Sequence, residues 1–480
     1  MKTINIESKR EVCWDWYLAD KIENITLKLH KPKKKNLALE CNAPWEGCTC
    51  GYPAVMKVGD TYRLYYRASG RQDLKDESFC MVESRDGKTF TRPELCKFET
   101  GGTLKNNVFF REDRFVDNFS VHYDTNPDCP DDEKFKALSL IMPDDFSKTE
   151  LGYYKSPDGI NFTFVCILPI RGIFDTLNVV LWDKKEKIYR MYIRDFHDEN
   201  GETSKYDPNT AMEKAIRDIR LTTSKDFVNW SEPKKIEYDE GTADLQMYTN
   251  QIIKYPRSDI YLGMPTRYAD RAKDAVNFKY LPDWGGERTK LIKDGHREGT
   301  AVTDCVLMTS RDGFHFSRTD DAFMTPGLED KYNWVYGDCY PSHGIIETCA
   351  DDCSGAHELS FFAGSGYRNE CTKFIRYTVR LDGFFSWYGN FGGGAVTTVP
   401  IAFTGNSMSI NFATSAIGSI RILLCDEDGK PIEGYDSGIL FGDSLDRNVD
   451  FEKPLESISG KTVRIRFELK DCDLYSFKFE

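Results

Sequence analysis

The sequence predicts an all-β protein, a five-bladed β-propeller followed by a C-terminal antiparallel β-sandwich. Three observations predict this fold. A seven-residue phrase recurs along the 480-residue chain, short runs of alternating polar and apolar residues surround each copy, and the composition changes after Phe391. Repeated units built from short strands indicate β-sheets arranged around an axis.

The recurring phrase reads Ser-x-Asp-Gly-x-x-aromatic at residues 84–90, 156–162 and 310–316. A degenerate copy stands at 224–230 and a weaker one at 380–385. Asp-Gly favours a hairpin turn, because glycine accepts the positive φ that the turn needs. We expect the aromatic residue that follows to pack back between neighbouring blades.

Each repeat contains strands in the same order. A first apolar strand, such as 52–58 or 179–182, is followed by a turn and a second strand, such as 62–67 or 189–194. A third strand leads into the Asp-Gly turn and a fourth leaves it on the outer edge. Alternation over short runs favours strands over helices throughout.

The domain boundaries follow from this pattern. We expect a catalytic propeller over residues 44–389, with residues 1–43 packing on it as an N-terminal extension. Long insertions at about 195–217 and 270–299 interrupt two blades, and loops of this length are often functional. Gly392–Gly394 resembles a linker, and the short strands that follow it predict a sandwich over 390–480.

Composition excludes several classes of protein. The net charge is −13 with acidic residues spread along the chain, which argues against nucleic acid as a partner. No apolar run is long enough to span a membrane. The first ten residues lack the apolar stretch of a signal peptide, and the 15 cysteines lack disulfide-framework spacing. We therefore expect a cytoplasmic protein with reduced thiols, whose oligomeric state the sequence leaves open.

Three carboxylates are the candidate catalytic residues. Asp117 and Asp175 stand where first strands enter the predicted blades, and Glu46 lies in the loop that enters blade one. Carboxylates from separate blades around one pocket suit glycoside hydrolysis, which needs one protonated and one ionised group. The alternative is structural, since Asp at such positions often caps strand ends.

Several polar and aromatic residues are candidates for substrate binding. Arginines at the ends of second strands could hold a carboxylate ionised, or grip an acidic sugar; the alternative is surface pairing with Asp and Glu. Two aromatic residues could stack on a sugar, a histidine could donate to a hydroxyl, and three asparagines stand behind the first-strand positions. These residues are Arg67, Arg194, Arg267, Trp45, Tyr248, His343, Asn118, Asn178 and Asn250. No metal or cofactor is required, although Asp and Asn near the axis could hold a structural calcium ion.

The chain resembles the five-bladed propeller glycosidases of the family 32 and family 43 type. Those enzymes carry blade turns reading Ser-x-Asp-Gly-x-x-Trp/Phe, as here at Ser84, Ser156 and Ser310. Family 32 enzymes also carry a C-terminal β-sandwich. By position, the resemblance implies Glu46 as nucleophile or base, Asp117 as the orienting carboxylate and Asp175 as the acid.

The sequence departs from the family 32 motifs at each catalytic position. The nucleophile motif Trp-x-Asn-Asp-Pro-Asn-Gly is replaced by residues 44–47, Pro-Trp-Glu-Gly. The Arg-Asp-Pro motif is absent at 114–119, and the Glu-Cys motif is replaced at 174–178. These departures indicate a distinct family of propeller glycosidases.

The predicted function is therefore an exo-acting glycoside hydrolase for small oligosaccharides or glycosides. Two alternatives stay open. One is a glycoside phosphorylase, with phosphate held by Arg67, Arg194 and Arg267. The other is a non-catalytic carbohydrate-binding propeller.

Overall fold

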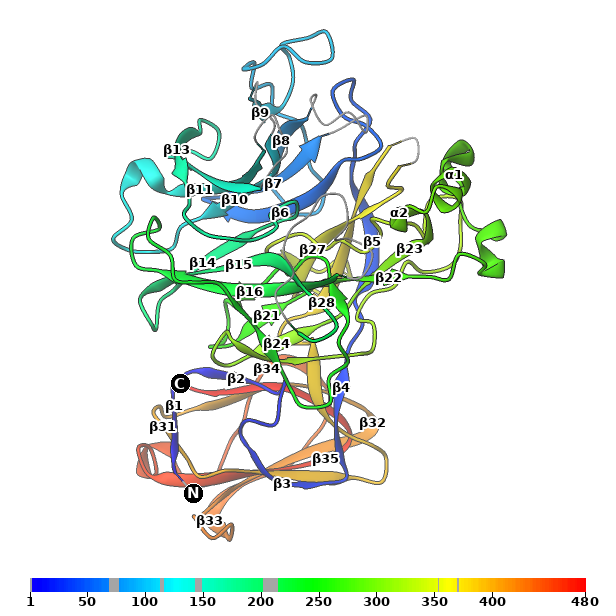
Figure 1. The fold of residues 1–480 in the computed structure, drawn as a ribbon. Coiled ribbons are helices and arrows are strands. Elements are labelled where there is room, and N and C mark those ends of the chain that lie inside the picture. Colours follow the sequence, from blue (N-terminus) through cyan, green and yellow to red (C-terminus); the bar gives the residue numbers. More distant parts are fainter. Residues whose placement is uncertain are drawn as a thin grey trace.

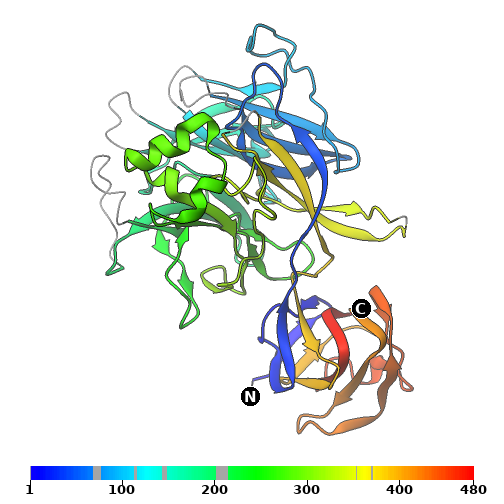
Figure 2. The same cartoon turned by 90° about the vertical axis from the view of Figure 1, so that its right-hand side faces the viewer.

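The computed structural model describes residues 2–68, 77–112, 116–142, 149–201, 215–352, 354–368 and 371–480. Its described residues are mainly β-strands, so the all-β prediction is confirmed. Figure 1 shows a larger body that contains β6–β28 above a smaller one that contains β1–β4 and β30–β35. Both chain ends lie in the smaller body (Figure 2).

The first three repeats each form a four-stranded antiparallel sheet in sequence order. The first sheet contains β6 (Gly51–Val58), β7 (Thr61–Ala68), β8 (Ser78–Ser84) and β9 (Val108–Phe110). The second contains β10 (Val116–Tyr123), β11 (Phe135–Ile141), β12 (Glu150–Ser156) and β13 (Thr163–Ile167). The third contains β14 (Val179–Asp183), β15 (Ile188–His197), β16 (Ile216–Ser224) and β17 (Lys234–Lys235).

The fourth repeat is divided between two sheets. One pairs β18 (Glu237–Tyr238), β25 (His315–Arg318), β24 (Met308–Ser310), β21 (Tyr261–Gly263) and β20 (Ile253–Lys254), in that order. The other pairs β19 (Gln246–Met247), β22 (Thr266–Asp270) and β23 (Ala301–Cys305). The break between β21 and β22 separates the two halves of the second strand of this repeat.

The last sheet of the larger body takes one strand from the start of the chain. Its order is β26 (Ile346–Cys349), β27 (His357–Ser365), β28 (Lys373–Arg380) and β5 (Lys33–Glu40). First strands of successive sheets contact one another, from β6 to β10, from β10 to β14 and from β14 to β20. β26 contacts β6, and a parallel bridge joins Ala54 to His343. The last sheet is thus placed beside the first.

The recurring phrase forms a turn, as the sequence predicts, and its aspartate side chain caps that turn with hydrogen bonds. In the first copy the Asp86 carboxylate accepts hydrogen bonds from Ser84 Oγ at 2.8 Å and from the Lys88 and Thr89 N–H groups at 2.8 and 3.2 Å. Gly87 has φ +69°. Phe227 takes the glycine position of the degenerate copy at φ +66°. The four turns therefore share one side-chain-capped geometry.

The smaller body is an 11-stranded sheet system. Its C-terminal strands are β29 (Phe385–Gly389), β30 (Gly394–Thr398), β31 (Ile401–Phe403), β32 (Met408–Cys425), β33 (Pro431–Leu440), β34 (Asp443–Asn448) and β35 (Thr462–Phe479). The N-terminal strands are β1 (Ile4–Glu7), β2 (Arg10–Val12), β3 (Ala19–Glu23) and β4 (Ile25–Leu29). One buried cluster that includes Trp387, Phe412 and Phe467 forms the core.

The pairing divides the N-terminal 43 residues between the two bodies. β1 pairs with β31, β2 with β35, β3 with β30 and β4 with β29, whereas β5 pairs with β28. Residues 4–29 therefore supply four strands to the smaller body, whose edge strands need partners. Part of this segment also packs on the larger body, where Trp14 contacts Tyr255 and Asp15 pairs with Arg311. The domain boundaries near residues 44 and 390 stay predictions.

Short helices occupy the second insertion, where the sequence favoured strands throughout. They are η3 (Val276–Tyr280), η4 (Trp284–Gly286), α1 (Glu287–Lys293) and α2 (Arg297–Thr300). Elsewhere in the described residues, η2 (Asp131–Glu133) and η5 (Leu455–Ser457) are single turns of 3-10 helix. The buried Arg288 side chain ties α1 to the Gly299 and Trp334 carbonyls. The first insertion lengthens β15 and β16, and its residues 202–214 lie outside the described chain.

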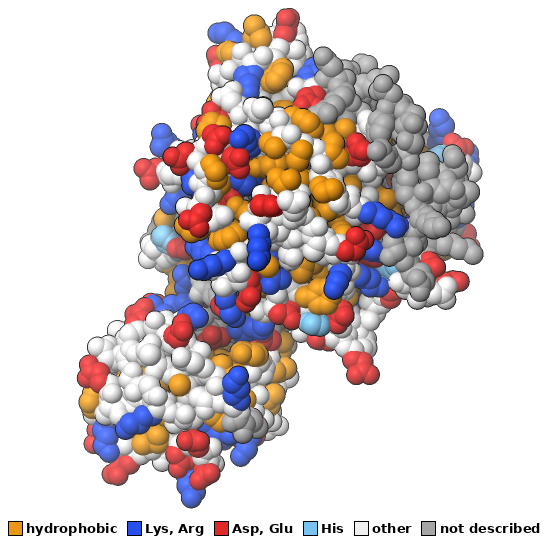
Figure 3. Space-filling view, turned by 60° about the vertical axis from the view of Figure 1, so that its left-hand side comes forward, with side chains coloured by type: hydrophobic (Ala, Val, Ile, Leu, Met, Phe, Trp, Pro, Cys, Tyr) orange, Lys and Arg blue, Asp and Glu red, His pale blue; other side chains and the backbone are white. Residues whose placement is uncertain are grey.

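The visible surface carries both signs of charge. Figure 3 shows acidic and basic side chains interspersed over both bodies on that face. Within the described residues, no helix is long and apolar enough to cross a membrane.

Candidate functional site

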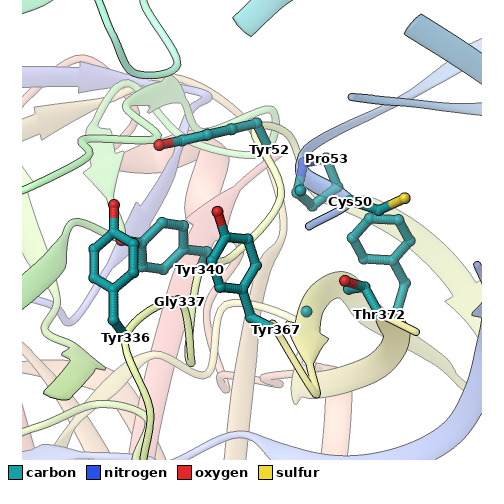
Figure 4. A pocket seen from close by; sticks show the side chains of 11 residues that line it. Cys50, Tyr52, Pro53, Tyr336, Gly337, Tyr340, Tyr367 and Thr372 are labelled. Atoms are coloured by element: carbon teal, nitrogen blue, oxygen red, sulfur yellow. The ribbon is translucent and has the colours of Figure 1, made fainter. Parts of the chain in front are cut away.

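Tyrosines from four segments gather where first strands of different sheets meet. The Tyr248 ring lies 5.6 Å from Tyr340, 5.8 Å from Tyr336 and 5.8 Å from Tyr268, and Tyr52 lies 5.9 Å from Tyr340. Figure 4 shows Tyr52, Tyr336, Tyr340 and Tyr367 around one space. The cavity there, of about 20 Å³, has room for roughly one water molecule.

Arg67 joins this tyrosine cluster to Asp117. Its Nη1 donates to Asp117 Oδ1 at 3.0 Å and to Asn118 Oδ1 at 3.2 Å, and its guanidinium lies 5.0 Å from the Tyr52 ring centroid. Nη2 donates to the Tyr367 hydroxyl at 3.4 Å. The predicted residues Arg67, Asp117 and Asn118 therefore lie together, as the sequence led us to expect.

Glu77 completes this group. Its carboxyl lies 3.6 Å from Arg67 Nη1 and hydrogen-bonds to Asp117, and its side chain is only 2% exposed. Burial raises the pKa of Glu77 well above its ordinary value, and the charge of Asp117 raises it further, while Arg67 offsets part of the rise. This environment therefore favours a protonated Glu77.

The backbone at the strand entrances is unusual in both of the first two sheets. Tyr52 and Asn118 have φ values of +52° and +54°, in the left-handed region. The strand registers shift at the same places, between Gly51 and Ala54 and between Asp117 and Ser120. Such backbone costs about 1–3 kcal/mol per residue and persists where surrounding contacts hold it, often at functional sites.

Two more arginines lie on the other side of the tyrosines. The Arg194 and Arg217 guanidiniums lie 4.9 and 5.1 Å from the Tyr248 ring centroid. Asp175 forms an ion pair with Arg194 and is 40% exposed at its side chain. Asp175, Arg194 and Tyr248 therefore lie together, and Asp175 is accessible to solvent.

The charges beside Tyr248 change its acidity. Burial alone would raise the pKa of Tyr248, but the positive charges of Arg194 and Arg217 outweigh that effect. A hydrogen bond from Tyr336 adds to them, with the two hydroxyl oxygens 2.6 Å apart. The pKa of Tyr248 is therefore lowered below its ordinary value.

Glu46 and Trp45 lie apart from this group. Glu46 is buried and accepts hydrogen bonds from Tyr66 Oη and from Arg92 Nε and Nη2. Tyr66 and Arg67 are neighbours on β7, so their side chains point to opposite faces of the sheet. Glu46 therefore lies across the sheet from Arg67 and Asp117. Trp45 donates to Asn107 Oδ1 at 2.8 Å on that same side.

Three of the predicted binding residues hold the fold. Asn178 Nδ2 donates to the Phe174 and Thr176 carbonyls, and Asn250 Nδ2 donates to the Tyr192 carbonyl. Burial lowers the pKa of His343 to about 4, so its ring is neutral at pH 7. These contacts favour a structural role for Asn178 and Asn250. His343 is tied through its backbone, whose N–H donates to the Pro53 carbonyl at 2.8 Å, while its ring Nε2 has no partner among the described residues.

Arg267 is held in a separate cleft. It forms a bidentate ion pair with Asp304 at 2.8 and 2.5 Å and donates to the Asp320 carbonyl. The cleft beside it has a volume of about 560 Å³, within the usual range of ligand pockets. Tyr268 and Gln246 also line it, so it adjoins the tyrosine cluster.

Sequence reasoning missed Glu77, Arg217 and Tyr336. Glu77 and Arg217 precede or begin third strands, whereas the search covered the ends of first and second strands. Third strands also begin near the tyrosine cluster. A charged residue at the start of a third strand could therefore have identified Glu77 and Arg217 from the sequence. Tyr336 lies in the irregular segment before β26, where no periodicity marks it.

No family model matches the chain, and no curated protein matches its sequence. Solved structures similar to it include an N-acetylgalactosamine deacetylase from F. plautii in complex with blood group B trisaccharide, at 11% identity and TM-score 0.43, covering 92% of this chain and 95% of that one. The GH32 β-fructofuranosidase of Bombyx mori is similar at 10% identity and TM-score 0.39, covering 94% of both chains. An α-L-arabinofuranosidase mutant from Fusarium graminearum, with an iminosugar inhibitor, matches at 12% identity and TM-score 0.40, covering 78% and 94%.

The structures similar to this chain thus include glycoside hydrolases, at 10–12% identity. This distant resemblance agrees with the one expected from the sequence. At TM-scores below 0.5, the activity has to be argued from the site itself.

Proposed function

We propose that the protein is a glycoside hydrolase whose acid and base come from different sheets. The observation that carries this proposal is the buried Glu77–Asp117 pair beside Arg67. Hydrolysis of a glycoside requires a carboxyl group that stays protonated to act as the acid, and burial beside Asp117 keeps Glu77 in that state.

Glu77 is the proposed proton donor. It gives its proton to the glycosidic oxygen as the bond from that oxygen to the anomeric carbon breaks. Asp117, held by Arg67, keeps Glu77 protonated until that moment. Glu77 takes the acid role that the resemblance gave to Asp175. The base or nucleophile role given to Glu46 passes to Asp175, because the two oxygens of Glu46 are occupied by Arg92 and Tyr66.

Asp175 is the proposed second carboxylate. Its ion pair with Arg194 holds it ionised, and its partial exposure leaves it accessible to substrate. It either takes a proton from the attacking water or attacks the anomeric carbon directly. In both cases water finally supplies the hydroxyl that replaces the leaving group.

We also propose that the five groups of strands are the blades of a propeller. The contacts from β6 through β10 and β14 to β20, and from β26 back to β6, support a ring. β5 then closes blade five, and β1–β4 join the proposed C-terminal sandwich. We propose exo action on small glycosides, since the cavity of about 20 Å³ at the tyrosines leaves no room for the interior of a polymer.

The proposed location is the cytoplasm. All fourteen cysteines of the described chain are free thiols, which supports a reducing compartment. The proposed mechanism needs no cofactor. Among the described residues, no group of three or more His, Cys, Asp or Glu side chains is arranged to hold a metal ion.

Activity on a panel of aryl glycosides, furanosides included, tests the proposal with and without phosphate. Glu77→Gln and Asp175→Asn should each lower kcat by a hundredfold or more, as expected for loss of an acid or base. Asp117→Asn should also lower kcat, because it removes the charge that keeps Glu77 protonated. Asp436→Asn, on the smaller body, is the matched control and should keep full activity. Full activity in Glu77→Gln would contradict the assigned proton donor.

Dependence of the activity on phosphate distinguishes the second candidate function, a glycoside phosphorylase, from a hydrolase. A phosphorylase would release the sugar as its phosphate and would be inactive without phosphate. Absence of wild-type activity on every glycoside would favour the alternative of a non-catalytic carbohydrate-binding propeller.

A further inference from the structure

Arg194 and Arg217 form a pair on one face of the third sheet. Arg194 and Phe196 alternate along β15, and Phe196 lies opposite Arg217 on β16. All three side chains therefore share a face. Both guanidiniums stack on the Phe196 ring at 5.6 and 5.7 Å, and both lie near Tyr248.

These two arginines are buried with few partners. Arg194 is 2% and Arg217 is 6% exposed. Arg194 Nη2 contacts Asp175, and Arg217 Nη1 donates to the neutral Gln246 side chain at 2.7 Å. Among the residues that the structure describes, Arg194 Nε and Nη1 and Arg217 Nε have no hydrogen-bond partner.

Unpartnered buried donors are costly. A buried polar group without a partner costs about 1–3 kcal/mol, and more when it is charged. In the described contacts the two guanidiniums have one carboxylate between them, Asp175, which pairs with Arg194. The pair therefore carries an uncompensated positive charge and spare N–H donors, the combination that binds an oxyanion.

Room for the rest of a ligand lies next to the pair. Arg217 lies 4.2 Å from the Tyr268 ring and bonds to Gln246, and both of these residues line the 560 Å³ cleft. A sugar in that cleft would lie beside Gln246 while a charged substituent reaches Arg217.

We propose that Arg194 and Arg217 bind an oxyanion, either the carboxylate of a uronosyl substrate or a phosphate group. This inference rests on the proposed function, since it names the substrate class of that site. It follows that the preferred substrate carries a negative charge, or that phosphate is a co-substrate.

Calorimetric titration tests the pair without any turnover. Galacturonate, glucuronate and inorganic phosphate are the anionic probes, and galactose and glucose are the neutral ones. We expect an anion to bind at least tenfold more tightly than its neutral counterpart. Arg217→Ala should remove roughly tenfold or more of that affinity, as expected for a charge-assisted bond. Arg421→Ala is the control, because it removes the same positive charge from the smaller body and should leave the anion affinity unchanged.

The selective probe identifies the source of the anion. Binding of a uronate supports an acidic sugar substrate, and binding of phosphate alone supports phosphorolysis. Equal affinity for charged and neutral sugars with no phosphate binding would overturn the proposal. So would unchanged anion affinity in Arg217→Ala.

A second measurement does not depend on the arginine variants folding. An anion between the guanidiniums would partly cancel the charge that lowers the pKa of Tyr248. The near-ultraviolet titration of the phenol, with Tyr248→Phe as the reference, should move to higher pH when the anion is added. An unmoved titration at saturating anion would contradict the proposal. Anion binding without glycoside turnover would instead contradict the proposed hydrolase and leave this site standing.

Discussion

The hydroxyl oxygens of Tyr248 and Tyr336 lie 2.6 Å apart, although 88 residues separate the two in sequence. Tyr248 comes from the segment that carries β19, and Tyr336 from the segment before β26. Their bond therefore connects two neighbouring sheets at the point where the arginines approach. This contact makes the acidity of Tyr248 sensitive to a residue that carries no charge.

Replacing Tyr336 should make Tyr248 a weaker acid. Tyr336→Phe removes the hydrogen bond that helps to lower the pKa of Tyr248, so that pKa should rise. We expect roughly a tenfold smaller ionisation constant, the worth of one such hydrogen bond. Difference absorbance titration against Tyr248→Phe measures it, and Tyr435→Phe, on the smaller body, is the control. An unchanged titration would show that the arginines alone set the acidity.

Asp338 should make the protein less stable as pH rises. Burial raises the pKa of Asp338 to about 7, only partly offset by the N–H of Val335, which it accepts at 2.9 Å. Between the ordinary carboxyl pKa and about 7, the folded chain holds a proton that the unfolded chain has released. The free energy of unfolding contributed by this group therefore falls with rising pH in that window.

Asp338→Asn keeps an acceptor for Val335 and removes the titration. The variant should lose the decline in stability between pH 5 and about 7 that the wild type owes to this group. Thermal melts at both pH values measure the difference. A wild type and a variant with parallel pH profiles would contradict the prediction.

A side chain at Gly159 should destabilise the second turn. An added Cβ would lie 2.6 Å from Tyr65 Oη and 2.8 Å from Phe135 Cδ1, at φ +75°. Gly159→Ala should cost about 2–4 kcal/mol, from backbone strain plus overpacking. Gly429→Ala has a similar φ of +84° with no atom within 4 Å, so it isolates the strain, about 1–2 kcal/mol. Chemical denaturation compares the two, and equal losses would contradict the steric argument.

Asp382 should couple the two bodies. Its buried carboxylate accepts from Arg257 Nε at 2.8 Å and Tyr255 Oη at 2.7 Å in the larger body, and from Ser476 Oγ at 2.7 Å in β35. Asp382→Ala leaves Arg257 and Arg10 without their buried partner, which should cost about 3–5 kcal/mol.

Acid should weaken the same contact. Burial alone would raise the pKa of Asp382, but the bond and charge of Arg257 outweigh it and lower the pKa. Its stabilisation is therefore present above the ordinary carboxyl pKa and is lost as pH falls through the lowered value. Asp382→Ala should show a smaller loss of Tm on acidification than the wild type. Asp443→Ala, at an exposed pair with Arg380, is the control.

Local chemistry explains what the sequence could predict. The Ser-x-Asp-Gly turns form from contacts within a few residues, so the phrase at 84–90 was sufficient to place them. Aligning the repeats also placed Arg67 and Asp117 near each other, although their contact joins two different sheets. The turn depends on local geometry, and the Arg67–Asp117 contact depends on the repetition of the same strand order in each sheet.

Long-range pairing explains what it could not. The sequence predicted that Arg267 lies beside Arg67 and Arg194, because the second strand of each repeat was assumed to be continuous. The sheet of the fourth repeat breaks after Gly263, and β22 pairs Arg267 with Asp304 instead. Glu77 lies next to Asp117 only because β10 packs beside the first sheet. β1–β4 pair with strands more than 350 residues away in sequence. A local sequence pattern does not specify which strands pair when they are far apart in the chain.

The strand β5 lies next to β28, close to the far end of the larger body in sequence. A ribosome therefore releases β5 long before its neighbour exists, and β1–β4 wait longer still. The nascent chain must keep some forty residues unpaired while most of the protein is translated. Until then these strands expose open edges to other chains, so a chaperone that shields the early segment would raise the yield of folded protein.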